Sequence, residues 1–398
     1  MGKKKLTIAS GRPYTVKKLQ FMKNLMRTFI STAIIIAFIL LLNACKKDKV
    51  TPIVTYPAKT RVYYIAAEEV IWDYAPQGNN VYMGMPFDSI DSVYAVNLPL
   101  GPTPHIGRKN LKARYIEYTD STFTTPKPSM PEWQHLGILG PVIRAIVGDS
   151  IIVYYKNNTT INTSLHVHGL EYDASSEGAP YNNGTNGAGN IIAPGGKYMY
   201  KYFARDGSGP GPAQPSSIVW LYHSHVNMDE SDLYSGLVGA IIVTKKGMGD
   251  ANAKPLDVDR EFVTLFFIWD ENNSLYLHQN TATYCPGFTN PNPGDFIESN
   301  KKRAINGMFM GNLPGLIMNK GERVRWYVMG MGSDMDIHTP HWHGNTVTVN
   351  GQNTDVVEIL PATMLTCDMI PDNVGTWGFH CHVSNHMNAG MTALYIVQ

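Results

Sequence analysis

The C-terminal end of the chain carries a dense set of side chains that bind soft and borderline metal ions. The set comprises His380, Cys381, His382, His386 and Met391. Two His, one Cys and a weak Met form the ligand set of a blue, type 1 copper site, for which His338 would supply the second His. Because neighbouring side chains on a strand point to opposite faces, Cys381 would hold one copper while His380 and His382 reach other metals. This arrangement would connect an electron entry site to a second metal cluster.

Three further groups of histidines have the spacing needed to ligate such a cluster. They contain His166 and His168, then His223 and His225, then His338, His341 and His343. Each i, i+2 pair places two imidazoles on one face of a strand, and the three-residue offset turns His338 towards the Cys381 side. One such pair alone would more often be two satisfied or exposed histidines. Ten of the thirteen histidines fall in these groups, too many for a zinc site with about four ligands.

These four groups resemble the copper motifs of the multicopper oxidases. The resemblance assigns the type 1 copper to His338, Cys381, His386 and axial Met391, and the type 2 copper to His166 and His341. It assigns the binuclear type 3 pair to His168, His223, His225, His343, His380 and His382. It therefore implies four copper ions per subunit. In this family a reducing substrate gives single electrons to the type 1 copper, and dioxygen is reduced to water at the trinuclear cluster.

The first 44 residues are expected to be a signal peptide. Basic residues extend to Arg27, an apolar run follows from 34 to 42, and Ala44 precedes Cys45. The apolar run is too short for a confident membrane span. The segment resembles the lipobox of bacterial lipoproteins, which predicts cleavage before Cys45 and a lipid anchor on it; the alternative is an ordinary signal peptide. We expect a location in the cell envelope of a Gram-negative-type bacterium, periplasmic or surface-exposed.

Removal of this segment makes the protein acidic. The segment contains eight of the 33 Lys and Arg residues and no Asp or Glu. The rest of the chain therefore has 25 basic and 32 acidic residues, a net charge of −7. Such a surface has no general attraction for nucleic acid. Two cysteines remain, Cys285 and Cys367, and an oxidising compartment permits a disulfide between them. The sequence leaves open whether they meet.

Short β-rich runs separated by Gly, Pro and Asn predict an all-β fold. Residues 45–56 have the composition of a tether, and the rest of the chain contains an internal repeat. The segments at 148–153, 166–169 and 223–226 parallel those at 321–326, 341–344 and 380–383. We therefore predict two cupredoxin-like Greek-key β-sandwich domains, residues 57–250 and 251–398.

The repeat also predicts where a blue copper site is absent. Thr163, Ser224, Asp229 and Tyr234 stand where the second half has His338, Cys381, His386 and Met391. The first domain should therefore hold no type 1 copper, unlike the two-domain nitrite reductases. The trinuclear cluster needs four histidines from each domain. The resemblance to small laccases implies a homotrimer in which domain 1 of one subunit meets domain 2 of the next; the alternative is a monomer whose own domains meet.

Most of residues 62–398 also resemble a domain pair of ceruloplasmin and hephaestin. The matching segments are YYIAAEE at 63–69, WDYA at 72–75, HLGILGP at 135–141 and GNLPGL at 311–316. Those relatives are ferroxidases with carboxylates and a His beside the blue copper. Glu298 matches one carboxylate, but Arg303 replaces the iron-binding His and Asn385 replaces an aspartate. Ferroxidase activity is therefore our second hypothesis, and Glu298 could equally be a solvated surface carboxylate.

The main hypothesis is a laccase-like oxidase of phenolic or similar small donors, with dioxygen as the acceptor. A copper-binding electron carrier would need only the blue site, so the other eight histidines argue against it. The methionines before His338 permit Cu(I) oxidation, although core packing is the preferred explanation for them. Tyr172 and Glu177 have the spacing of a tyrosine and an acid near the trinuclear cluster of small laccases. A carboxylate there could supply protons for oxygen reduction, and two surface loop residues are the alternative.

Overall fold

The structure is a computed structural model. It describes residues 2, 57–101, 103–181, 187–227, 230–288 and 294–398. Apart from Gly2, the expected signal peptide (1–44), the tether, Cys45 and Asp229 lie outside the described residues, so those expectations stay predictions. Within the described part of the chain, no helix is both long and apolar enough to cross a membrane.

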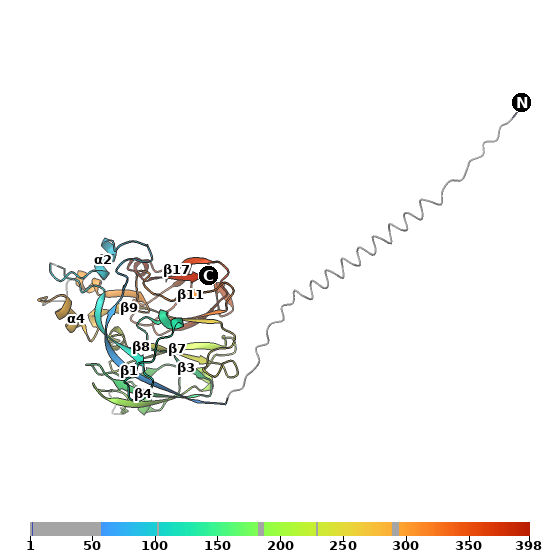
Figure 1. The fold of residues 1–398 in the computed structure, drawn as a ribbon, viewed down its shortest axis with the longest axis horizontal. Coiled ribbons are helices and arrows are strands. Elements are labelled where there is room, and N and C mark those ends of the chain that lie inside the picture. Colours follow the sequence, from blue (N-terminus) through green and yellow to red (C-terminus); the bar gives the residue numbers. More distant parts are fainter. Residues whose placement is uncertain (1, 3–56, 102, 182–186, 228–229, 289–293) are drawn as a thin grey trace. The chain divides into compact units, whose positions relative to one another are not determined.

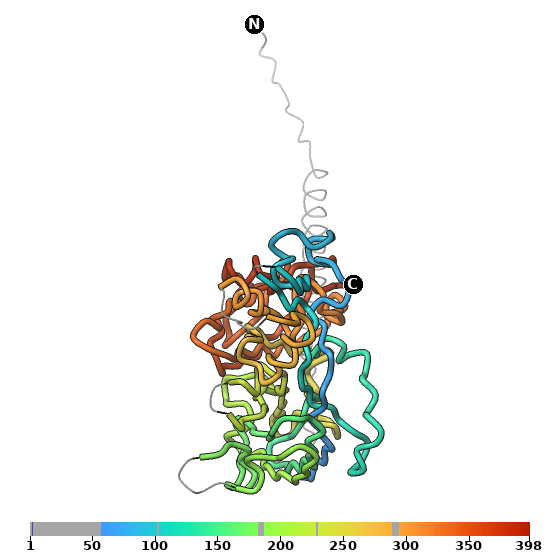
Figure 2. Tube along the Cα trace, turned by 90° about the vertical axis from the view of Figure 1, so that its left-hand side faces the viewer, coloured from blue at the N-terminus to red at the C-terminus, as the bar shows by residue number. Residues whose placement is uncertain are grey.

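The described chain is built mainly from strands, which confirms the all-β prediction (Figure 1). Four sheets contain them, in the strand orders β2-β1-β4-β6, β3-β8-β7-β5, β10-β9-β12-β16-β14-β15 and β11-β18-β17-β13. The first two sheets use strands before residue 250 and the other two use strands after it. In Figure 2 the orange and red residues of the second half gather at one end, and the green residues of the first half at the other.

The strands of the first half are β1 (Thr60–Asp73), β2 (Lys109–Glu117), β3 (Ile143–Ile146), β4 (Ser150–Asn157), β5 (His166–Val167), β6 (Lys197–Phe203), β7 (Ser217–His223) and β8 (Val238–Thr244). Those of the second half are β9 (Arg260–Asp270), β10 (Lys301–Ile305), β11 (Ile317–Met318), β12 (Val324–Gly330), β13 (Pro340–Trp342), β14 (Val347–Val349), β15 (Gln352–Thr354), β16 (Met364–Met369), β17 (Gly375–Cys381) and β18 (Thr392–Val397). Short α-helices join them: α2 (Ser89–Ala95), α3 (Ser231–Tyr234), α4 (Leu277–Tyr284), α5 (Gly294–Ser299) and α6 (Ser384–Asn388).

Burial follows the strand period. In β4 the side chains of Ile151, Val153 and Tyr155 are buried, and those between them are partly exposed. Alternation of this kind places one face of a strand against the core. The two halves also share a pairing pattern, because β4 lies parallel to β1 and β12 lies parallel to β9. The sequence repeat therefore corresponds to a repeated arrangement of strands.

The two halves are joined by a buried interface. Apolar residues of β7 and β8 pack in the same core cluster as residues of β9. The fully buried His135 accepts a hydrogen bond at Nε2 from the Val263 N–H at 3.0 Å. Asn306 Nδ2 donates to the carbonyl oxygens of both residues, at 2.6 and 2.8 Å. Arg144 forms an ion pair with Glu261 at 2.7 Å. These contacts fix the two halves against each other.

Candidate metal centre

The first candidate site is the Cys381 group, defined as His338, Cys381, His386 and Met391. The donor atoms of the first three residues lie within 4.8 Å of one another, and all three are buried. Cys381 Sγ lies 3.9 Å from His338 Nδ1 and 3.7 Å from His386 Nδ1. Met391 is fully buried, and its carbonyl oxygen accepts the Cys381 N–H at 3.1 Å. The backbone thus brings Met391 beside Cys381 and His386.

The surroundings of Cys381 favour its thiolate. Burial alone would raise the pKa of the thiol, but contacts with His338 and His386, together with backbone N–H groups, lower the pKa to about 6. One of these groups is the Thr339 N–H, 3.4 Å from Sγ. A thiolate is the form that binds metal. One thiolate, two imidazoles and a thioether are soft and borderline donors, and this set fits copper.

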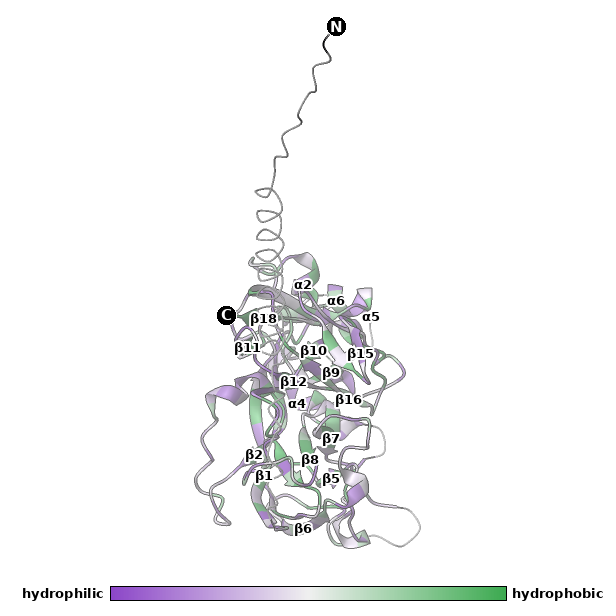
Figure 3. Cartoon of the chain, turned by 90° about the vertical axis from the view of Figure 1, so that its right-hand side faces the viewer, coloured by the Kyte–Doolittle hydropathy of each residue, from purple (hydrophilic) through white to green (hydrophobic). Residues whose placement is uncertain are grey.

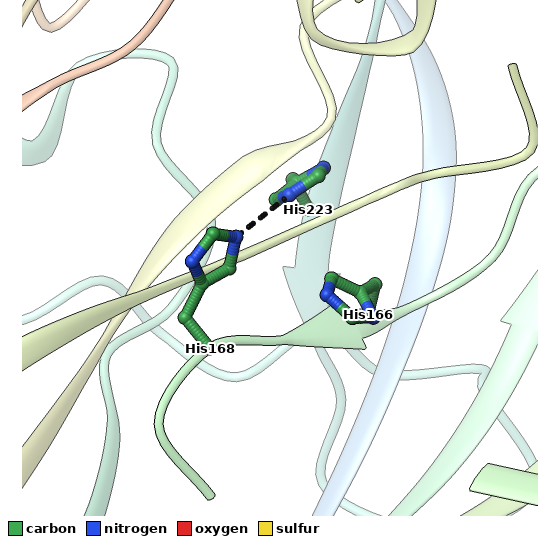
Figure 4. Close-up of side chains that lie close together, drawn as sticks. All are labelled: His166, His168 and His223. Atoms are coloured by element: carbon green, nitrogen blue, oxygen red, sulfur yellow. Dashed lines mark hydrogen bonds between the residues drawn. The ribbon is translucent and has the colours of Figure 1, made fainter. Parts of the chain in front are cut away.

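The second site, the first-half histidines, comprises His166, His168, His223 and His225. Antiparallel pairing of β5 with β7 sets His166 directly opposite His223. Nitrogens of His166, His168 and His223 lie within 4.8 Å of one another (Figure 4), with His168 Nε2 3.1 Å from His223 Nε2. The His225 ring lies 5.4 Å from that of His166. Burial lowers the pKa of His168 to about 4, so its imidazole is neutral and can bind metal.

The third site, the second-half histidines, comprises His341, His343, His380 and His382. Pairing of β13 with β17 places His341 opposite His380. His380 Nε2 lies 2.8 Å from His343 Nε2 and 3.4 Å from His341 Nδ1. The His382 ring lies 5.2 Å from that of His341. Each set of four histidines therefore forms a compact group of imidazoles.

Strand alternation turns Cys381 and His380 towards two different sets of candidate ligands, as the sequence predicts. Cys381 faces His338 and His386, whereas the adjacent His380 faces His341 and His343. The two groups are thus joined by the backbone between two consecutive residues. The chain also fixes the ring of His380, whose Nδ1 lies 2.9 Å from the Cys381 carbonyl oxygen.

The first-half and second-half histidines do not come together within one chain. Among the hydrogen bonds and ring contacts found for these described residues, each joins histidines of the same half. Figure 3 shows β5 and β7 in the lower part of the molecule and β18, the neighbour of β17, in the upper part. One subunit alone therefore presents two separate four-histidine groups.

Comparison with known proteins gives the family. Two family models, each described as multicopper oxidase, match residues 137–247 and 286–398. The chain belongs to the multicopper oxidases. Human hephaestin is 41% identical over 346 residues, which cover 85% of this chain and 29% of hephaestin. Mouse "Ferroxidase HEPHL1" is 42% identical over 85% of this chain and 29% of its own, and human ceruloplasmin is 38% identical over 89% and 32%.

The chain spans about a third of the length of these curated relatives. Among solved structures, a crystal structure of a multicopper oxidase aligns with a TM-score of 0.53 at 18% identity, covering 85% of this chain and 89% of that one. A copper nitrite reductase from Nitrosomonas europaea aligns with a TM-score of 0.51 at 18% identity, covering 85% and 94%. At such low identity these structures show the fold alone, and the multicopper oxidase structure supports the expected cupredoxin-like sandwich.

Tyr172 and Glu177 both lie beside His166, one through its side chain and the other through its backbone. The Tyr172 ring is edge-on to that of His166, with ring centroids 5.9 Å apart. Glu177 contacts the same histidine through its backbone, whose carbonyl oxygen lies 2.6 Å from His166 Nδ1. Its carboxylate accepts the hydroxyl of Tyr181. Tyr172 also lines an open depression with His166, His168 and Arg205.

Three residues of this multicopper oxidase lie beside the candidate metal ligands although the sequence pattern offered no reason to expect them there. Asp336 Oδ1 lies 3.2 Å from His338 Nε2, and Asp355 Oδ2 lies 3.5 Å from His341 Nε2. The Tyr82 ring is edge-on to His380 at 6.4 Å between centroids. Asp336 lies only two residues before His338, but it closes a turn and is not part of a strand, so strand parity gives no signal for it. The other two contacts depend on long-range folding and leave no local signal.

The partial match to a ferroxidase iron site is weakened by the structure. The Glu298 carboxylate binds Arg303 Nη1 at 2.7 Å and accepts the Tyr94 hydroxyl at 3.0 Å. Burial raises the pKa of Glu298, but Arg303 and its other partners outweigh burial and lower the pKa. The carboxylate is thus ionised and already paired. Asn385 is exposed at the start of α6, beside the buried His386.

Three of the four first-half positions that correspond to the Cys381 group are described, and other partners occupy them. Thr163 Oγ1 lies 2.6 Å from the Tyr155 hydroxyl, and Ser224 Oγ donates to Asp232 at 2.6 Å. Both buried hydroxyls are hydrogen-bonded to oxygen atoms of other side chains, and hydroxyl oxygens are not the donors of a blue copper site. Tyr234, at the methionine position, is buried in the shared core.

The other cysteines of the described chain are buried in apolar clusters. Cys285 and Cys367 are free, buried, and belong to different apolar clusters, so no disulfide joins them. Most methionines before His338 are also buried, which confirms core packing for five of them: Met308, Met310, Met318, Met329 and Met331. Met335 is 52% exposed.

Proposed function

We propose that this multicopper oxidase transfers electrons from low-valent metal ions to dioxygen. The observation that carries the proposal is the arrangement on β17, where Cys381 and His380 face two different groups of metal-binding side chains. An electron entering at one group thereby has a short covalent route to the other. When bound, copper supplies one-electron redox chemistry at the Cys381 group and oxygen chemistry at the histidines. We assign the type 1, type 2 and type 3 ligands as the sequence suggests.

The choice of a metal ion as donor rests on the relatives. A domain pair of proteins named hephaestin, ceruloplasmin and ferroxidase is about 40% identical to this chain. The comparisons thus favour the metal-ion hypothesis, Fe(II) or Cu(I), over the phenol-oxidising hypothesis that the sequence placed first. The acidic surface expected after removal of residues 1–44 would weakly attract such cations.

Small phenolic donors are the second candidate, and one observation favours them. Arg303 pairs with Glu298, the carboxylate that a ferrous ion would need. The Arg303 guanidinium repels a ferrous ion and already occupies the Glu298 carboxylate that would bind it. A laccase-like oxidase needs no such ligand, because a phenol gives up its electron without binding to a carboxylate.

We further propose that the active unit is a homotrimer. The four first-half histidines are separated from the four second-half histidines within a chain whose halves share a buried interface. Rotation of the halves to join both groups would break that interface. A neighbouring copy can supply the missing four histidines, and head-to-tail contacts of this kind close as a ring. Tyr172 and Glu177 would then lie beside the assembled cluster, where they could hold or donate protons during oxygen reduction.

Oxygen uptake by copper-loaded protein tests the function. Turnover is compared for Fe(II), Cu(I) and a dimethoxyphenol at equal concentrations, with copper-free protein as the control. Saturable turnover that is fastest with one of the metal ions supports the proposal. Faster turnover with the phenol would transfer support to the laccase-like candidate, and no uptake with any donor would reject both.

The membrane anchor is a separate proposal. Cys45 and its lipobox-like surroundings suggest that the enzyme is attached to the cell envelope through lipid. Metabolic labelling with a fatty acid tests it, because replacement of Cys45 by Ser should abolish the label and release the protein from membranes.

A further inference from the structure

Asp336 holds the side of His338 that faces away from Cys381. Its Oδ1 lies 3.2 Å from His338 Nε2, and both residues are fully buried. The other ring nitrogen, Nδ1, faces Cys381 Sγ at 3.9 Å. The imidazole is therefore held between a carboxylate on one side and the candidate copper position on the other.

The carboxylate itself sits among hydrogen-bond donors. The Ile268 N–H donates to Oδ1 at 2.7 Å and the Ser333 N–H donates to Oδ2 at 2.9 Å. An ionised carboxylate accepts hydrogen bonds and donates none, so these partners suit the charged form. Gly332 is required for this arrangement, since a Cβ there would lie 2.2 Å from Oδ2. The backbone thus leaves room for the Asp336 carboxylate and supplies its hydrogen-bond donors.

The first half of the chain has no equivalent of this carboxylate. The repeat aligns His338 with Thr163, which places Ile161 at the position of Asp336. Ile161 belongs to the apolar surroundings of its own half. A buried acid is therefore no requirement of the fold at this position. It occurs in the half that contains Cys381.

We propose that Asp336 is a positioning residue that sets which donors can reduce the Cys381 group. Its carboxylate fixes the His338 tautomer with the proton on Nε2, which leaves the Nδ1 lone pair for copper. The negative charge makes the imidazole a stronger donor and stabilises Cu(II) over Cu(I) in a buried site. The reduction potential is thereby lowered, so that donors of correspondingly low potential are favoured.

This inference rests on the proposed function in one respect, namely that copper at the Cys381 group receives the electron. In each transfer the donor loses one electron and the bound copper changes from Cu(II) to Cu(I). No covalent bond forms or breaks. The carboxylate acts only through His338.

The test is the reduction potential of the blue site in copper-loaded Asp336→Asn protein. Asn keeps the shape of the side chain and removes its charge. The Cu(II)/Cu(I) equilibrium should shift about tenfold or more towards Cu(I), roughly 59 mV upward. The rate with a donor of high potential should rise relative to that with a donor of low potential. Asp355→Asn is the matched control, because that carboxylate contacts His341 and should leave the blue-site potential unchanged.

An unchanged potential in Asp336→Asn protein with an intact blue absorption spectrum overturns the inference. If this variant fails to fold or to bind copper, pulsed EPR of the wild-type protein decides. The remote nitrogen of His338 should differ from that of His386 because it is bonded to a carboxylate, and equal couplings would overturn the inference. Neither readout requires turnover, so failure of the proposed oxidase activity is detected separately by oxygen uptake.

Discussion

Cys381 and His380 are adjacent on β17, yet Cys381 Sγ faces His386 at 3.7 Å while His380 Nε2 faces His343 at 2.8 Å. The pleat of the strand divides two metal groups between consecutive residues. The same two residues are also joined by a hydrogen-bond contact, because His380 Nδ1 lies 2.9 Å from the Cys381 carbonyl oxygen. Electron flow in the proposed enzyme depends on this pair.

Replacement of Cys381 by Ser should remove the blue copper and leave the histidine groups intact. We expect loss of one copper per subunit, loss of the blue absorption, and a decrease in oxygen uptake larger than the ~100-fold caused by loss of an outer-shell partner. Metal analysis and absorption spectroscopy measure the result. Cys285→Ser is the control, since Cys285 is buried in a separate cluster. Blue colour in the Cys381→Ser protein would contradict the assignment.

Two inactive variants should complement each other if the active unit is a ring. His168→Ala damages the first-half group and His343→Ala damages the second-half group. After the two proteins are dissociated, mixed and reassembled, about a quarter of the sites should combine an intact group from each chain. Oxygen uptake should then reappear in the mixture and be absent from either variant alone. A monomeric enzyme predicts no recovery.

Arg303→His should increase the rate with Fe(II) selectively. The change removes the cation that pairs with Glu298 at 2.7 Å and introduces a possible ligand. We expect kcat/KM for Fe(II) to rise about tenfold and that for the phenol to stay within twofold, since a restored ligand is worth ~1.4 kcal/mol. Arg323→His, at an exposed position, is the control. Equal increases with both donors would show that Arg303 acts on the blue site in general.

Copper-free protein should lose stability as the pH falls below about 6.5. Burial lowers the pKa of His135 from 6.5 to about 3, so the unfolded chain binds a proton that the folded chain excludes. The stabilisation is present above the unfolded pKa and declines towards pH 3, by up to ~1.4 kcal/mol per pH unit.

Urea unfolding of copper-free protein at pH 7 and pH 5 measures this decline. His135→Gln should reduce the pH dependence and keep an acceptor for the Val263 N–H, whereas the exposed His278→Gln should leave it unchanged. The same pH dependence in both variants would exclude His135 as its source.

Local sequence patterns were sufficient to predict an all-β fold and to group the histidines by their spacing. The alternation of Cys381 with His380 is a property of any strand, and the i, i+2 histidine pairs follow the same rule. The internal repeat predicted the absence of a blue site in the first half, where Thr163 and Ser224 pair with oxygen atoms.

Contacts between distant segments could not be predicted in this way. Asp355 reaches His341 only because an isolated bridge joins Val356 to that histidine. The pairing of Arg303 with Glu298 depends on the turn between α5 and β10. The donor preference had no local pattern either, and the phenol hypothesis gave way to the metal-ion hypothesis once whole-chain similarity was considered.

The separation of the two histidine groups within one chain has a consequence for the safety of the reaction. In the proposed ring, a subunit that has not yet met its neighbours can bind copper at the Cys381 group and accept an electron, but it has no complete centre for dioxygen. Incomplete reduction of oxygen releases damaging species, and a lone subunit would have no means to begin it. Assembly itself would then act as the checkpoint that licenses oxygen chemistry.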